Sequence, residues 1–189
     1  VTAEVLVAAV RHEVLKQYEA VFTSAGMKLA QVGLRPLANK LAVCELLKHG
    51  MPDRVLFIDV GPTLTEIDVL RNSFLAFSRA ASVHFSEGAA EGAQLTLVRD
   101  DGAAEIVASD NQTEAAGDRR GRRDEFVSTL LVEVTRSIEA YRATDPGARI
   151  DHAVIGGDLG VEEALSEVIQ QRLRITTELY NPATSFGWE

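Results

Sequence analysis

A carboxylate, a tight glycine turn and two hydroxyls follow one another in the sequence DVGPTLT. Asp59 stands near the end of an apolar run, Gly61 permits a sharp turn, and Thr63 and Thr65 lie on the segment that returns. A glycine turn lets backbone N–H groups approach a phosphate, and a carboxylate beside it can hold hydrated Mg²⁺. Pro62 removes one of those N–H donors. The same pattern also fits an ordinary hairpin turn with exposed threonines.

A pair of glycines forms the second candidate site, at a predicted junction between a strand and a helix. Gly156 and Gly157 allow a flat ligand to lie against the backbone, and Asp158 follows them. The alternative is a loop in which Asp158 caps the next helix. Open α/β sheets bind ligands at the ends of neighbouring strands. We therefore expect the two glycine motifs to lie at the same edge of a sheet.

Other reactive side chains offer weaker patterns. The four histidines lack metal-ligand spacing, no serine has the glycine pattern of a nucleophile elbow, and Cys44 lies on an apolar helical stripe. A ribonuclease H-like nuclease would place Asp59, a helical glutamate such as Glu125 or Glu133, and Asp158 around two Mg²⁺ ions. The net charge of −9 argues against that enzyme, because nucleic acid binds to positive surfaces.

Composition places the chain among globular proteins. Its 189 residues are 46% hydrophobic and 25% charged, and its single cysteine excludes an internal disulfide and a multi-cysteine zinc site. No apolar run reaches the roughly 18 residues of a membrane span. The chain opens at Val1, without methionine, in an apolar segment. We expect a domain taken from a longer protein.

The elements that must position these residues divide into two parts. Residues 1–52 are predicted to form a β-α-β-α unit with strands at 4–10 and 28–34. Its first helix ends at Gly26 and its second begins near Pro36. The second helix is expected to bury a stripe made of Leu37, Leu41, Cys44 and Leu47.

Residues 53–189 are predicted to form an α/β lobe with a mixed sheet and flanking helices, of actin-like or ribonuclease H-like architecture. A meander is expected at 55–60, 63–71 and 74–82, in which Leu64, Glu66, Asp68 and Leu70 face opposite to Thr65, Ile67 and Val69. Later elements are a hairpin at 94–98 and 104–108, a loop at 109–124, a helix from Phe126, a strand at 152–156, a helix marked by Val161 to Leu173, and a strand at 174–179. The hairpin and the loop form an insertion at 83–124. Strands joined through helices must run parallel, which makes the sheet mixed.

Three blocks of the sequence resemble one family. VLFIDVGPTLTEIDVLRNSFLAFSRAAS is similar to the phosphate-contacting hairpin of actin-like ATPases, in the form found in the PilM family of type IV pilus assembly proteins. EVLVAAVRHEVLKQYEAVFTSAGMKLAQVGLRPLA resembles the segment that precedes it in that family. VEVTRSIEAYR and HAVIGGDLGVEEALSEVIQQRLRITTELYNP resemble its closing helix, adenosine motif and terminal Asn-Pro. The resemblance covers most of the chain outside 83–124 and implies the C-terminal half of such a protein.

The resemblance implies a nucleotide site. The matching positions, with Asp59 also the metal ligand, are Asp59, Gly61, Thr63 and Thr65 for phosphate and Gly156 and Gly157 for adenosine. They imply ATP and Mg²⁺ as ligands of the complete fold. Thr63 replaces a small residue, Asp158-Leu159 brings bulk and negative charge beside the adenine position, and the family's first phosphate motif has no counterpart here. For this chain alone we expect no bound cofactor.

The resemblance also implies a function without catalysis: a cytoplasmic scaffold, peripheral to the inner membrane, that binds the short cytoplasmic tail of a bitopic protein such as PilN. The first alternative is an ATP-binding actin-like ATPase whose missing lobe lies outside this chain, and the second is the metal-dependent nuclease. Three surfaces could bind a partner: the arginine cluster at 119–123, the hairpin at 94–108, and the face of residues 1–50. We favour the last, occupied by the partner tail or by a second copy of the chain.

Overall fold

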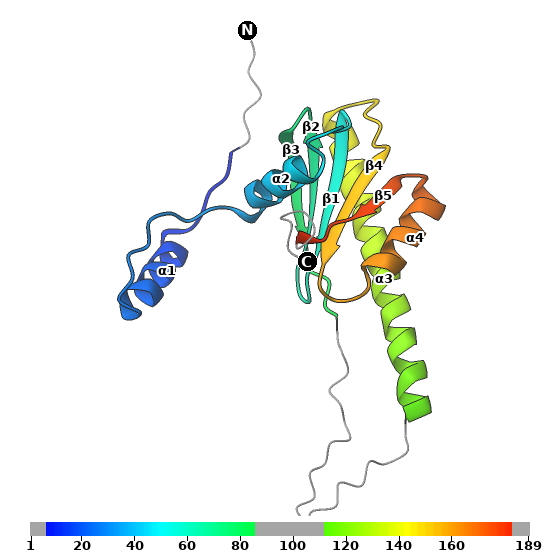
Figure 1. The fold of residues 1–189 in the computed structure, drawn as a ribbon, viewed down its shortest axis with the longest axis horizontal. Helices are drawn as coiled ribbons and strands as arrows, with labels where there is room; N and C mark the ends of the chain where they lie inside the picture. The colour runs from blue at the N-terminus through cyan, green and yellow to red at the C-terminus, as the bar shows by residue number, and fades with distance from the viewer. Residues whose placement is uncertain (1–6, 86–111, 183–189) are drawn as a thin grey trace, which may run out of the picture.

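The computed structural model describes residues 7–85 and 112–182, with the backbone alone for 112–119. Along the chain the elements are α1 (His12–Ser24), α2 (Arg35–Leu46), β1 (Arg54–Val60), β2 (Thr65–Arg71), β3 (Phe74–Ala81), α3 (Gln112–Thr144), β4 (His152–Gly157), α4 (Glu162–Leu173) and β5 (Thr176–Leu179). Helix α2 covers one face of the sheet, and α3 and α4 cover the other (Figure 1).

The five strands form one mixed sheet in the order β3-β2-β1-β4-β5. The pairs β1–β2 and β2–β3 are antiparallel, whereas β1–β4 and β4–β5 are parallel. Asn72 and Ser73, with φ of 51° and 66°, make the tight turn between β2 and β3. The parallel strands are reached through α3 and α4, so the mixed sheet with flanking helices is confirmed.

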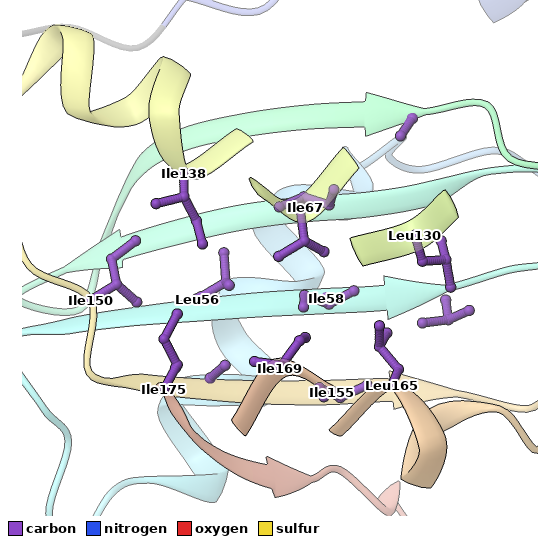
Figure 2. Packing of buried hydrophobic residues seen from close by; sticks show 14 of the residues in the cluster. Leu56, Ile58, Ile67, Leu130, Ile138, Ile150, Ile155, Leu165, Ile169 and Ile175 are labelled. Atoms are coloured by element: carbon purple, nitrogen blue, oxygen red, sulfur yellow. The ribbon is translucent and has the colours of Figure 1, made fainter. Parts of the chain in front are cut away.

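The core lies on both faces of the sheet, which explains why β1 is almost continuously apolar. Leu56, Ile58 and Val60 face α3 and α4, where they pack with residues such as Leu130 and Ile169 (Figure 2). On the other face a smaller cluster joins α2 to β1, β2 and β4 and comprises Val43, Leu47, Val55, Phe57, Leu70 and Val154. The site described below lies at one end of this smaller cluster.

The opening unit differs from the prediction. Helices α1 and α2 are present, but residues 7–11 and 27–34 lie outside any helix or strand, and residues 4–6 lie outside the described residues. A strand needs a neighbour for its N–H and C=O groups, and no described strand pairs with either segment. The predicted strand at 28–34 is therefore wrong, and the apolar residues that suggested it lie in an extended connection.

The buried stripe of α2 is also different. Leu37 and Leu41 are 48% and 66% exposed, whereas Asn39, Val43 and Leu47 are buried. The helix is thus rotated so that a polar residue faces the sheet. The physical reason is that carboxylates on β2 lie opposite Asn39 and bond to its amide.

Two boundaries change as well. Helix α3 begins at Gln112, so most of the loop predicted at 109–124 is helical. This segment holds no proline and has four arginines, which favour helix. Arg174 adopts the left-handed conformation that ends α4, so β5 begins only at Thr176.

The hairpin predicted at 94–98 and 104–108 lies outside the described residues. In the part of the chain that the structure describes, no helix is long and apolar enough to cross a membrane.

Candidate functional site

The two glycine motifs lie side by side at one edge of the sheet. In the parallel pairing of β1 with β4, Asp59 is the register partner of Gly156, and Val60 is the partner of Gly157. Beyond these strand ends lies a cavity of about 480 Å³. Its walls are the start of α2, the turn that follows β1, the loop that follows β4, and the chain that leaves β5. The expected meeting of the two motifs at a common edge is therefore observed.

Of the four positions matched to phosphate binding, two line this cavity. Asp59 and Gly61 do so, whereas exposed Thr63 does not. Thr65 is buried on the opposite face of β2, and no described residue bonds to its hydroxyl. A methyl group on Gly61 would lie 2.6 Å from the carbonyl oxygen of Leu64, so the turn requires glycine. Whether these residues hold a phosphate stays a prediction.

Packing within the chain is enough to explain the glycine pair, because neighbouring residues leave little room for side chains at Gly156 and Gly157. A side chain on Gly157, whose φ is 154°, would lie 2.7 Å from the carbonyl oxygen of Val60. A methyl group on Gly156 would lie 3.4 Å from the Tyr180 ring and 3.5 Å from the Phe57 ring. Tyr180 therefore occupies the space above Gly156 in which a flat ligand would lie.

A polar cluster attaches α2 to the sheet beside the cavity. The Asn39 amide donates hydrogen bonds of 3.0 Å to Glu66 and of 3.0 Å to Asp68. Arg35 approaches both Asp59 and Glu66 at 3.9 Å. Burial raises the pKa of Glu66 and of Asp68, while the Arg35 charge and the Asn39 bonds act in the opposite direction.

The sequence pattern predicted part of this cluster. Glu66 and Asp68 were expected on the face that carries Leu70, and the structure confirms it, because both bond to α2. Arg35, Asn39 and the Tyr180 ring gave no comparable signal. Arg35 and Asn39 could have been placed only by knowing which side of α2 faces the sheet. No sequence pattern connected Tyr180 to Gly156.

A two-metal nuclease site does not form from the proposed carboxylates. Glu133 lies on α3 and binds Arg79 at 2.6 Å, on the face of the sheet opposite to Asp59. Asp158 lines the cavity without capping α4, whose N-cap residue is Val161. Among the described residues no group of three or more histidine, cysteine, aspartate or glutamate side chains is placed to hold a metal ion.

A nucleotide with Mg²⁺ fits this cavity poorly. The charged residues in its lining are two carboxylates, Asp59 and Asp158, and one guanidinium, Arg35. Phosphate would meet this excess of negative charge, and Pro62 withholds a backbone donor. The lining therefore offers a nucleotide one cationic side chain against two carboxylates.

Comparison with known proteins points to one family. Residues 1–189 match the family described as type IV pilus assembly protein PilM. A chain of the PilM-PilN type IV pilus biogenesis complex superposes with a TM-score of 0.64 at 18% identity, covering 91% of this chain and 48% of that one. The Alp12 filament structure gives a TM-score of 0.48 at 10% identity, covering 77% and 48%. No curated protein matches the sequence. The chain spans about half the length of these structures, and such low identity shows the fold alone.

Proposed function

The chain belongs to the type IV pilus assembly protein PilM family, and on this basis we propose that it is a scaffold that binds the short cytoplasmic tail of a PilN-like bitopic membrane protein. It acts in the assembly of a type IV pilus or of a related secretion system. It is cytoplasmic and reaches the inner membrane through its partner. Support comes from the likeness of its fold to a chain of the PilM-PilN complex.

One observation carries the choice of a scaffold over an enzyme: the lining of the cavity at the strand ends is poorly suited to a nucleotide. Asp59 and Gly61 are in place, but a flat base would meet the Tyr180 ring above Gly156. The neighbouring Asp158 adds negative charge to the same lining, which disfavours a nucleotide. Binding of a partner tail needs neither phosphate donors nor an open space above Gly156, whereas binding of ATP needs both.

The second candidate is an ATP-binding actin-like protein whose other lobe lies outside this chain. It is favoured by the position of Asp59 beside the glycine pair, since the register brings the two motifs into one cavity. The two candidates differ in their need for nucleotide. The nuclease has no such support, because Glu133 lies across the sheet from Asp59.

The proposal is tested by co-purification with a PilN-like protein in detergent micelles. The matched control is the same membrane protein without its cytoplasmic tail. We expect the chain to be retained by the intact partner and released from the tail-deleted form. Retention by both forms, or by neither, contradicts a scaffold that recognises the tail.

A further inference from the structure

We propose that the outer edge of β3 is a dimer interface, at which it pairs in antiparallel fashion with β3 of a second copy of this chain. β3 is the end strand of the sheet and is bonded to β2 on one side, and no described strand pairs with its other side. The edge lies outside residues 1–50, the face favoured from the sequence. The inference goes beyond the proposed function and does not depend on tail binding.

The strand lacks the features that usually keep the edge of a sheet from pairing. Proteins often block such an edge with proline, with lysine or by making the end strand very short. β3 is 8 residues long and contains neither proline nor lysine. Its only charged side chain, Arg79, is held within the chain by Glu133 at 2.6 Å. The irregular pairing with β2 is confined to the part near the turn, at Val69 and Leu70, so residues 77–81 form a regular edge.

The sequence of β3 is complementary to itself. Phe77 and Arg79 lie on the face that carries α3, because their register partners Val69 and Ile67 belong to the cluster that packs against α3. In an antiparallel pair centred on Ser78, Phe77 of each copy lies opposite Arg79 of the other copy, on the same face. This pairing places a ring beside a guanidinium twice and keeps the two like charges from lying opposite each other. The charge pattern therefore favours a second copy as the occupant of the edge.

Exposed apolar side chains lie beside this edge. Phe74, the first residue of β3, is 73% exposed, and the Lys40 ammonium lies 5.7 Å from the centre of its ring. This side of α2 therefore faces the turn between β2 and β3. Leu37, one turn before Lys40, lies on the same side of the helix, and Leu41 follows Leu37 by one turn; both are exposed. A two-fold axis perpendicular to the sheet keeps α2 of both copies on one face, so the second copy lies beside these side chains and reduces their exposure to water.

Analytical ultracentrifugation tests the inference. The variant is Ser78→Lys at an exposed position, which places two lysines directly opposite each other at the centre of the pair. The control is Thr176→Lys, at an exposed position of β5 on the opposite edge of the same sheet. We expect the wild-type chain to dimerise and Ser78→Lys to raise the dissociation constant at least roughly tenfold, whereas the control changes it less than about twofold. An equimolar mixture of Ser78→Lys and Ser78→Glu should dimerise again, because the opposed charges then attract each other.

Hydrogen exchange of the wild-type chain keeps the test valid if these variants fold poorly. The amides of residues 74–81 should become at least roughly tenfold more protected as the protein concentration rises, while those of β5 stay unchanged. A wild-type chain that remains monomeric, a dimer that survives Ser78→Lys, or protection of residues 74–81 that does not depend on concentration overturns the inference. Each of these outcomes leaves the proposed function standing, because tail binding is measured separately.

Discussion

Asn39 is the residue on which the polar attachment of α2 depends. Its amide donates to the two carboxylates of β2, both of which are buried. Removing a donor leaves these groups with unmade hydrogen bonds in a place that water reaches poorly, and each such loss costs about 1–3 kcal/mol. A residue that conventional helix patterning would place outside is therefore part of the core.

We predict that Asn39→Ala lowers the free energy of unfolding by about 1–3 kcal/mol. Gln17→Ala, at an exposed position of α1, is the control and should change it by less than about 0.5 kcal/mol. Urea unfolding followed by circular dichroism measures both. Equal stability of the two variants would show that the amide bonds contribute nothing.

The buried carboxylates of β2, Glu66 and Asp68, should make the stability of the protein depend on pH. Because burial raises the pKa of Glu66 and of Asp68, the folded state binds protons that the unfolded chain has released. In the window between the unfolded pKa, about 4, and the raised values, the stability contribution of these groups decreases as pH rises. Asp68→Asn removes one titrating group while keeping its shape.

We expect Asp68→Asn to be more stable than wild type at about pH 8, and its advantage to shrink toward about pH 4.5. Urea titrations at both pH values measure the difference. Gln17→Ala, which changes an exposed side chain that does not titrate, should show no such trend. An advantage for Asp68→Asn that grows as pH falls would mean that the folded pKa is lowered.

The lining of the cavity should give it little affinity for a nucleotide. Because Pro62 withholds a backbone donor and Asp158 adds negative charge beside Asp59, we expect no measurable ATP hydrolysis and weak binding at most. Isothermal titration calorimetry with Mg-ATP measures this. Saturable micromolar binding that is lost in Asp59→Ala and kept in Asp151→Ala would favour the ATP-binding alternative.

At the scale of elements, the side of α2 that faces the sheet decides which leucines stabilise the protein. Leu47, the C-cap residue of α2, is buried against the sheet, whereas Leu41 projects from the helix into solvent. We expect Leu47→Ala to cost about 2–5 kcal/mol and Leu41→Ala less than about 0.5 kcal/mol in the free energy of unfolding. Similar losses in the two variants would support the stripe predicted from the sequence, because that stripe contains both leucines.

The strands could be predicted because their patterns are local. A continuous apolar run gave β1, and the alternation of Glu66 and Asp68 with Ile67 gave the two faces of β2. Which side of α2 faces the sheet could not be predicted, because apolar residues lie on both sides of the helix. The buried side is decided by carboxylates nearly thirty positions away along the chain. The strand predicted at 28–34 failed for a similar reason: its pattern is local, but strand formation needs a partner.

The candidate site could also be predicted only in part. The sequence placed Asp59 and Gly156 at neighbouring strand ends, since connections through helices constrain strand order. It gave no sign that Tyr180 packs on Gly156, because that contact depends on side-chain packing rather than on motif spacing. The alternation along the strand did place Thr65 on the face opposite to Glu66, which is the face away from the cavity.

At the scale of the whole molecule, α1 stands apart from the sheet (Figure 1). It has no buried residue, and Tyr18 and Val21 are exposed. Large apolar side chains of this kind favour contact with another surface. The exposed apolar side chains of α1, within the face of residues 1–50, therefore stay a candidate surface for self-association.

We predict that in dilute solution the amides of α1 exchange with deuterium at least roughly a hundredfold faster than those of β1, because α1 lacks tertiary packing. Hydrogen exchange with mass spectrometry measures both segments, and light scattering reports the mass. Protection of α1 equal to that of β1 in a monomer would contradict its lack of packing. Protection that appears only with dimers would identify a second copy as its cover.

The most direct test of the central claim is binding of a labelled PilN-like tail peptide to this chain, with and without Mg-ATP, followed by fluorescence anisotropy. The account predicts saturable binding without nucleotide and the same affinity when Mg-ATP is present, because the scaffold needs only its own surface. A tail that does not bind, or that binds only in the presence of Mg-ATP, would contradict it.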